Sequence, residues 1–109
     1  METLFLLLAG HALGDFVLQS DSMAKGKGRP KGNATALGPY QPTWHYWLTA
    51  HSFIHGGIVY LITQDLTFGL AETLLHWLID FMKCESRYNI HVDQALHIGC
   101  KLIWAALLI

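Results

Sequence analysis

The stretch ETLLHWLID, residues 72–80, decides the fold because Glu72, His76 and Asp80 recur at every fourth position among apolar residues. On an α-helix, side chains four residues apart lie on the same face. The stretch therefore predicts a helix with one polar stripe on an otherwise apolar surface. The stripe consists of residue types that bind metal ions.

The same four-residue spacing occurs in three other apolar segments. The motifs are HALGD at residues 11–15, HSFIH at 51–55 and DQALH at 93–97. Each motif lies in a segment close to the ~20 residues that an α-helix needs to cross a bilayer. The four segments cover residues 3–18, 44–63, 66–82 and 90–109. The sequence thus predicts an all-α fold, a bundle of four transmembrane helices with a polar, metal-binding interior, as one domain over residues 1–109.

Composition favours a membrane protein and argues against several other classes. Of the 109 residues, 52% are hydrophobic and 14% are charged, whereas ~25% of the residues in a soluble domain are charged. Seven Lys and Arg against eight Asp and Glu do not give the basic excess of a nucleic-acid-binding protein. Cys84 and Cys100 are too few for a disulfide scaffold.

The basic residues predict how the helices are oriented. All but Lys101 lie in two connections, and they are Lys25, Lys27, Arg29, Lys31, Lys83 and Arg87. The positive-inside rule places both connections, including the loop 19–43, in the cytoplasm and both termini outside. Met1 and Glu2 provide no basic start for a signal peptide, and no small-residue cleavage site follows. The first segment is therefore expected to be retained as a helix.

The polar stripes are expected to meet at one depth. With a rise of ~1.5 Å per residue, they occupy a layer about 5 to 17 Å below the cytoplasmic interface. An acidic side chain at the bilayer centre costs about 2.5 to 3.5 kcal/mol, and only Lys101 is available inside the membrane as a counterion. Protonated carboxyls bonded to neutral histidines are the alternative for any single pair, but four stripes in one layer favour a bound cation. The expected ligands are His11, Asp15, His51, His55, His76, Asp80, Asp93 and His97.

The ligand types indicate a class of metal. Imidazole with carboxylate suits zinc, iron or manganese, and the lack of a cysteine pair argues against a thiolate zinc site. Eight ligands exceed the coordination of one ion. Either two ions lie about 3.5 to 4 Å apart, which we favour, or some of the eight side chains orient the others. The expected cofactor is one or two divalent ions, zinc first, with iron or manganese as alternatives.

Taken together, the motifs resemble those of a known family. HALGDFVLQ at 11–19, HSFIH at 51–55, ETLLHWLID at 72–80 and DQALH at 93–97 look like the motifs of small bacterial and phage membrane proteins of unknown function. That family in turn resembles the YdjM-like inner-membrane proteins, which are described as metal-dependent hydrolases. The resemblance implies a multi-pass protein of the bacterial inner membrane. It also implies that Glu72 belongs to the same motif set as the eight expected ligands.

These features predict a membrane-embedded, metal-dependent hydrolase that acts on a lipidic phosphate or ester near the cytoplasmic interface. Glu72 is the expected general base, with the role of a ninth ligand or of a counterion for Lys101 as alternatives. Lys101, one turn beyond His97, is expected to bind a phosphate. Its alternatives are an ion pair with Glu72 or an outward extension to the interface.

Two other function classes stay open. A di-iron or other redox membrane protein is one, because the spacing of His51 and His55 is similar to a desaturase histidine box. A non-enzymatic protein that binds metal, or that modifies a host membrane by binding a partner, is the other. Membrane lipid is the expected partner and nucleic acid is not, while a homo-oligomer and an unidentified protein partner are left open.

Overall fold

The computed structural model describes residues 1–19, 27, 44–85 and 87–108, and within them all regular structure is helical. The predicted all-α fold with four helices is therefore confirmed for this part of the chain. Apart from Gln19 and Lys27, the loop 19–43 lies outside the described residues. The elements are α1 (Glu2–Ala12), which continues as the π-helix η1 (Leu13–Val17), α3 (Trp44–Thr63), α4 (Leu66–Cys84) and α5 (Ile90–Leu107).

Local sequence signals account for the helix boundaries. Asp65 caps α4, because its side chain accepts a hydrogen bond of 2.9 Å from the Thr67 amide. Asn89 caps α5 in the same way, with a bond of 3.0 Å from the Val92 amide. Gln64 has a positive φ of 57°, and this left-handed residue reverses the chain between α3 and α4. The predicted ends of these helices consequently agree with the observed ones to within two residues.

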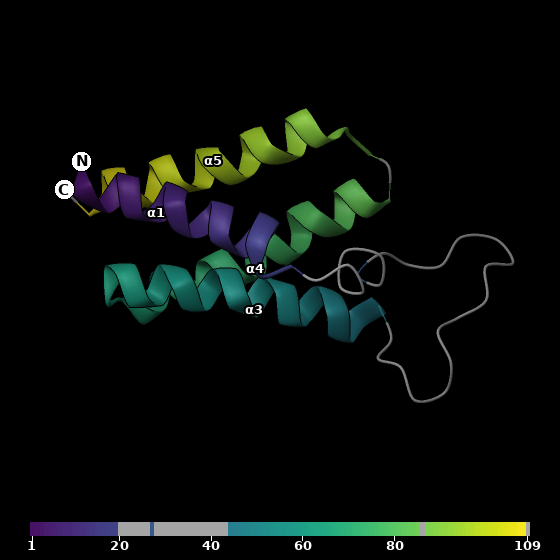
Figure 1. Cartoon of the computed structure of the whole chain (residues 1–109), viewed down its shortest axis with the longest axis horizontal. Helices are drawn as coiled ribbons and strands as arrows, with labels where there is room; N and C mark the ends of the chain where they lie inside the picture. Colours follow the sequence, from purple (N-terminus) through teal and green to yellow (C-terminus); the bar gives the residue numbers. More distant parts are fainter. Residues whose placement is uncertain (20–26, 28–43, 86, 109) are drawn as a thin grey trace, which may run out of the picture.

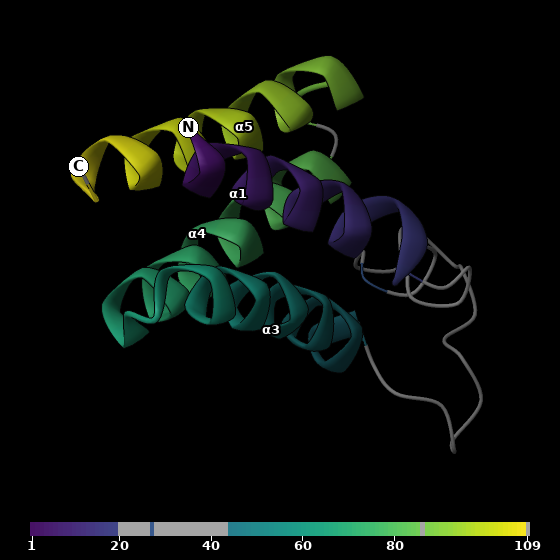
Figure 2. The same cartoon turned by 60° about the vertical axis from the view of Figure 1, so that its left-hand side comes forward.

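The four helices form a closed ring in which each helix contacts two neighbours. Close backbone contacts join α1 to α3, α3 to α4, α4 to α5 and α5 back to α1, whereas the diagonal pairs among the described elements meet only through side chains. Both termini lie at one end of the bundle, whereas the start of α3 and the connection from α4 to α5 lie at the other (Figure 1). The turned view in Figure 2 shows α1 beside α5 above the pair of α3 and α4. All four polar stripes therefore face one interior.

The helices α3 and α4 approach most closely where two glycines face each other. A Cβ atom on Gly56 would lie 2.7 Å from the Gly69 carbonyl oxygen, and one on Gly69 would lie 2.9 Å from the Tyr60 Cβ. Thr73 occupies the remaining space and donates a 2.9 Å hydrogen bond to the same Gly69 carbonyl. Only glycine, whose side chain is a single hydrogen atom, fits between these backbones. The crossing therefore sets the spacing of the two helices.

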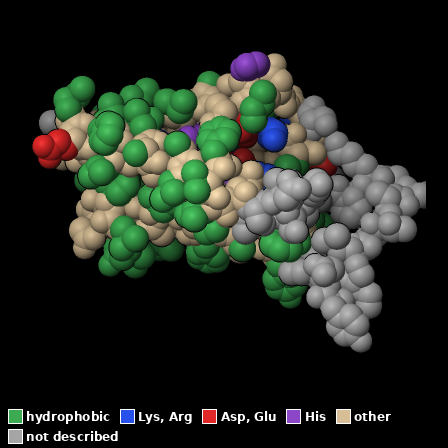
Figure 3. Space-filling view, in the orientation of Figure 1, with side chains coloured by type: hydrophobic (Ala, Val, Ile, Leu, Met, Phe, Trp, Pro, Cys, Tyr) green, Lys and Arg blue, Asp and Glu red, His purple; other side chains and the backbone are tan. Residues whose placement is uncertain are grey.

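The interior of the bundle is polar and its exterior is apolar. Among the described residues the buried large apolar side chains are Leu7, Leu48, Val59 and Trp104. Three of them, Leu7, Val59 and Trp104, form a small apolar core. The buried polar side chains outnumber them, while large hydrophobic residues are exposed on every helix. Figure 3 shows apolar side chains spread over the visible faces of the bundle. Among the described residues, polar side chains thus gather inside the bundle and many large apolar side chains lie on its surface.

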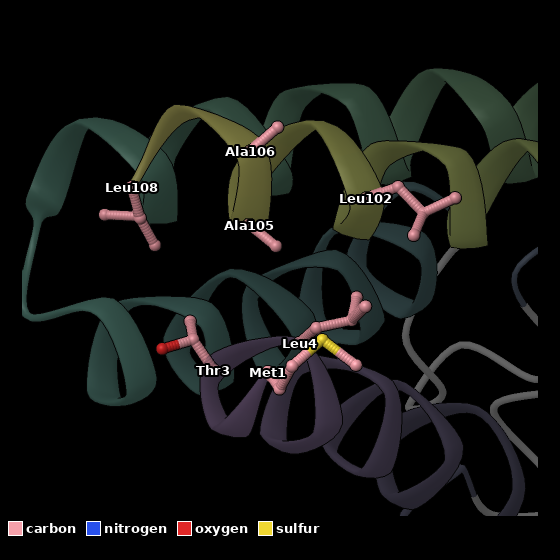
Figure 4. A pocket seen from close by; sticks show the side chains of 7 residues that line it. All are labelled: Met1, Thr3, Leu4, Leu102, Ala105, Ala106 and Leu108. Carbon is pink, nitrogen blue, oxygen red and sulfur yellow. The ribbon is translucent and has the colours of Figure 1, made fainter.

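A second apolar feature lies at the end of the bundle that holds the termini. A pocket opens there between α1 and α5 (Figure 4), away from the polar interior. The side chains that line it are Met1, Thr3, Leu4, Leu102, Ala105, Ala106 and Leu108. The lining of this pocket therefore contains no His, Cys, Asp or Glu side chain.

The expectation of four membrane-spanning helices is not supported. Among the described helices, none combines the length and the apolar character that crossing a membrane requires. α1 has only 11 residues before the π-helix begins. The other three helices carry the polar stripes, which lower the mean hydropathy of each helix as a whole. Apolar side chains that gather on one face do not make a helix apolar throughout.

The close crossing of α3 and α4 gives a test of the fold. We expect Gly56→Ala to lower the free energy of unfolding by about 1 to 3 kcal/mol or more, because the new methyl group meets rigid backbone. Gly57→Ala is the matched control, since nothing lies within 4 Å of a Cβ at that position. It should stabilise the helix by up to about 1 kcal/mol. Denaturant unfolding of both variants measures the difference, and equal stabilities would contradict the packing.

Candidate metal centre

Every helix contributes ligand-type side chains to one buried cluster in the bundle interior. All eight residues expected as ligands are at most 8% exposed. Helical periodicity places them on one face of each helix, and the packing of the ring turns these faces toward each other. The four stripes therefore meet as expected, while their depth below a membrane interface stays a prediction.

Asp15 is the acceptor for one half of the cluster. Its Oδ1 atom lies 3.1 Å from His51 Nε2, 3.0 Å from His55 Nε2 and 3.7 Å from His76 Nε2. Its Oδ2 atom accepts a 2.8 Å hydrogen bond from the side-chain amide of Gln94. One carboxylate from the first helical segment thus joins side chains of α3, α4 and α5.

The position of Asp15 depends on a local departure from α-helical geometry. Residues Leu13–Val17 form a π-helix, and the Leu18 amide bonds to the Leu13 carbonyl five residues before it, at 2.8 Å. An extra residue per turn rotates the side chains that follow. The four-residue spacing from His11 to Asp15 predicted the shared face, but it contained no signal for the π-helix.

Asp80 is the acceptor for the other half of the cluster. Its Oδ1 atom lies 3.0 Å from His97 Nε2. Its Oδ2 atom lies 3.2 Å from His51 Nε2 and 3.4 Å from His76 Nε2. His51 and His76 thus face both Asp15 and Asp80, and these two imidazoles connect the two halves into a single centre.

Asp93 and Gln94, at the start of α5, complete the cluster. Asp93 Oδ1 lies 3.4 Å from His97 Nε2, and Gln94 donates to Asp93 Oδ2 at 3.2 Å. The side-chain oxygen of Gln94, Oε1, lies 2.9 Å from His11 Nε2. Gln94 therefore links His11, Asp15 and Asp93 through its side-chain amide.

Three overlapping groups of these side chains have the geometry to hold a metal ion. Within each group, one ligand atom per residue lies within 4.8 Å of the others. The groups are Asp15 with His51, His55 and His76; His76 with Asp80 and His97; and Asp15 with Asp93 and His97. Seven of the eight expected ligands belong to a group. His11 does not, because its Nε2 atom faces Gln94.

Several polar atoms of the cluster are buried without a hydrogen-bond partner among the described residues. They include His55 Nε2, both ring nitrogens of His76 and Asp93 Oδ1, each of which lies 3.0 to 3.5 Å from a polar atom of a neighbour but outside hydrogen-bond geometry. His55 and His76 are each 1% exposed. An unpartnered buried nitrogen costs about 1 to 3 kcal/mol. These lone pairs converge as they do in a metal site, where a cation would be their common partner.

The backbone of the first helical segment lies directly against His55. A Cβ atom on Gly14 would lie 2.7 Å from His55 Nε2. Glycine is therefore needed at this position for the imidazole to reach Asp15. Residue spacing along the sequence carries no signal for this contact of Gly14 with a histidine ring.

Lys27 is the residue of the site that sequence reasoning missed. It was predicted to serve only topology, as one of the basic residues of the loop 19–43. Its side chain is nevertheless buried, and its Nζ atom lies 3.0 Å from Asp80 Oδ2. Four basic residues in one loop carry no signal that singles out the one that enters the cluster.

The negative charge of the cluster extends to Tyr88, between α4 and α5. Burial, followed by the charges of Asp93 and Asp80, raises the pKa of the Tyr88 phenol to about 12. The hydroxyl donates to the Ile79 carbonyl. The hydrogen bond of the neutral phenol thus joins the α4–α5 connection to α4, near these carboxylates.

Glu72 and Lys101, expected as general base and phosphate ligand, lie together next to the cluster. Lys101 Nζ donates to Glu72 Oε1, and Trp104 Nε1 donates to Glu72 Oε2 at 2.7 Å. The alternative roles, with each residue as the counterion of the other, agree with this ion pair. The roles in catalysis and in substrate binding stay predictions.

Comparison with known proteins gives a family and no activity. One family model, described as "Protein of unknown function (DUF3307)", matches residues 3–109. No curated protein and no solved structure matches the chain. These findings show no relationship to the YdjM-like proteins. Since the match includes all four helices and the whole metal-type cluster, the chain belongs to the family of unknown function DUF3307.

Proposed function

We propose that this protein is a metal-dependent hydrolase whose reaction centre is the His and Asp cluster inside the helical ring. The observation that carries the proposal is the convergence of buried, unpartnered imidazole nitrogens on shared carboxylate oxygens. Histidines bonded to protonated carboxyls would leave fewer such atoms without a partner. A divalent ion would satisfy the nitrogen and oxygen lone pairs together.

The charges of the cluster also favour a cation. Asp15, Asp80 and Asp93 contribute three buried carboxylates, and the Lys27 ammonium contacts one of them, Asp80. Glu72 and Lys101 balance each other. The described part of the cluster thus has an excess of two negative charges when its histidines are neutral. Buried charges need partners, and a divalent ion supplies two positive charges.

The overlap of the three ligand groups supports two ions. Asp15, His76 and His97 each belong to two groups, and a carboxylate can bridge two ions that lie about 3.5 to 4 Å apart. If only one ion binds, the remaining side chains orient its ligands. Imidazole and carboxylate suit zinc first, with iron or manganese next. None of the three groups contains a cysteine.

A metal ion held by this cluster would supply hydrolytic chemistry, because it would lower the pKa of a coordinated water toward neutrality and polarise a phosphoryl or acyl oxygen. Asp93 Oδ1 is buried without a hydrogen-bond partner, which makes it an acceptor next to His97. Lys27 places an ammonium at the same cluster, where an anionic substrate group would meet it. We infer a phosphate or an ester as the substrate.

The apolar exterior supports a lipidic substrate and a location in a lipid membrane. Large hydrophobic side chains such as Phe53, Leu61 and Leu74 are 59 to 68% exposed. A lipid environment would cover these side chains, whereas their exposure to water costs ~25 cal/mol per Å² of apolar surface. We propose that the bundle lies among acyl chains, with its cluster accessible from the end where α4 connects to α5. The bacterial inner membrane is the proposed location.

A di-iron redox protein is the second candidate. Two bridging carboxylates with histidines from facing helices are the ligand arrangement of di-iron sites in four-helix bundles, and Asp15 and Asp80 each contact several imidazoles here. Metal identity separates the candidates, because a zinc-loaded protein has no redox chemistry. A bound metal without turnover would leave the non-enzymatic function, in metal binding or in contact with a partner.

The first prediction concerns metal content. We expect the purified protein to contain one or two equivalents of a divalent metal, and His55→Ala or Asp15→Asn to lose at least one. His91→Ala is the matched control, because His91 is an exposed histidine at the start of α5 and belongs to no ligand group. Elemental analysis measures all four proteins. An unchanged metal content in His55→Ala and Asp15→Asn would remove both residues from the ligand set.

The second prediction concerns activity. The zinc-loaded protein should hydrolyse a chromogenic phosphate or ester presented in mixed micelles, and His55→Ala should lower kcat/KM by more than ~100-fold. A loss of that size exceeds what an outer partner of a ligand contributes. His91→Ala should keep the native rate. Metal-loaded protein without turnover on either substrate class would contradict the hydrolase and favour a binding function.

The third prediction concerns the lipid environment. A nitroxide at position 74, where Leu74 is 62% exposed, should show high collision with oxygen and low collision with a water-soluble nickel reagent in liposomes. A nitroxide at position 91 should show the opposite preference, because it lies at the polar end of the bundle. Cys84 and Cys100 are replaced by alanine in both proteins to avoid double labelling. Equal nickel accessibility at the two positions would contradict lipid contact.

A further inference from the structure

A buried ion pair lies beside the cluster, toward the apolar core. Glu72 and Lys101 are 0% and 1% exposed, and Lys101 Nζ contacts Glu72 Oε1. Removing two charges from water costs several kcal/mol for each ion, even after relaxation. Stability alone is a weak reason to keep such a pair, so its neighbours decide what it does.

The donors around Glu72 hold both of its oxygens in place. Lys101 donates to Oε1 and Trp104 donates to Oε2 at 2.7 Å. Trp104 is itself packed in the apolar core with Leu7 and Val59. The carboxylate is therefore anionic, fixed in orientation and placed next to the apolar core. A group held in this way is poorly placed to accept a proton from a metal-bound water.

The same carboxylate faces a histidine of the metal centre. Glu72 Oε1 lies 3.5 Å from His76 Nδ1, one turn away on α4. Asp80, one turn further along, lies 3.4 Å from the other ring nitrogen, Nε2. His76 is thus placed between two carboxylates on the same helix face. Only the Nε2 side also faces Asp15, at 3.7 Å.

The carboxylate beside Nδ1 affects which nitrogen of the His76 imidazole carries the proton. A neutral imidazole carries its proton on one nitrogen and a lone pair on the other. An anionic carboxylate beside Nδ1 favours the proton there, which leaves the Nε2 lone pair directed at Asp15 and Asp80. A metal ligand needs that lone pair, and a carboxylate behind a ligating histidine fixes its tautomer and ring orientation.

We propose that Glu72, held by Lys101 and Trp104, is a positioning residue that keeps His76 Nε2 available as a metal ligand. The inference rests on the proposed metal centre and deepens it. It assigns Glu72 an action through His76, and it assigns Lys101 to the fixation of Glu72. The neutral Glu72–Lys101 pair performs this role without changing the net charge of the centre.

The tautomer of His76 tests the inference in the metal-free protein. In ¹⁵N NMR of protein with labelled histidines, His76 should carry its proton on Nδ1. The double variant Glu72→Gln with Lys101→Met removes both buried charges, so neither is left unpaired, and it should shift His76 toward a mixture of tautomers. A native tautomer in the double variant would overturn the inference. This measurement does not depend on metal binding, so it remains decisive if the proposed function fails.

Metal affinity provides the second readout. In competition with a chelator, the double variant should bind zinc about 10- to 100-fold more weakly with unchanged stoichiometry, as expected for loss of an outer partner of a ligand. Glu2→Gln, at an exposed glutamate on α1, is the control and should keep native affinity. Loss of one equivalent of metal would make Glu72 a ligand and overturn the inference. Native affinity with abolished turnover would make Glu72 the general base and overturn it as well.

Discussion

The burial of three carboxylates among imidazoles is the constraint on which the rest of this structure depends. Asp15, Asp80 and Asp93 are each at most 8% exposed, and a buried charge without partners costs far more free energy than any single packing contact contributes. Two of them, Asp15 and Asp80, meet donors from other helices. Asp15 reaches α3, α4 and α5, and Asp80 reaches α3, α5 and Lys27. These contacts connect the helix ring across its centre.

The polar interior determines where the apolar residues lie. Four helices of about 11 to 20 residues have a limited inner surface, and the cluster occupies much of it. Only a small apolar core remains, around Leu7, Val59 and Trp104. Most large hydrophobic side chains consequently lie outside, where a lipid environment would stabilise the fold more than water. The same distribution explains why no described helix is apolar enough throughout to cross a membrane.

Helix α4 carries three polar residues of the centre in order along one face. Its face begins near the apolar core, continues with Glu72 and its counterion, and then presents His76 and Asp80 at four-residue intervals. A fixed carboxylate lies behind the histidine, and a second one lies in front of it. Ligands oriented by neighbours of this kind are more precisely placed than ligands on a flexible loop. The arrangement suits the proposed metal centre.

The sequence by itself determined the helices and the identity of most of the candidate ligands, because both are periodic properties of single segments. The extent of the apolar segments placed α3, α4 and α5 within two residues of their observed ends, where the structure adds the caps at Asp65 and Asn89. The four-residue spacing identified the members of the cluster, of which only His11 lies outside the ligand groups. Only the tertiary structure decided which atoms face each other. The π-helix at Asp15, the approach of Lys27 to Asp80 and the placement of Glu72 behind His76 depend on helix rotation and depth. Residue spacing along one helix carries no information about these quantities, since they are set by packing between helices.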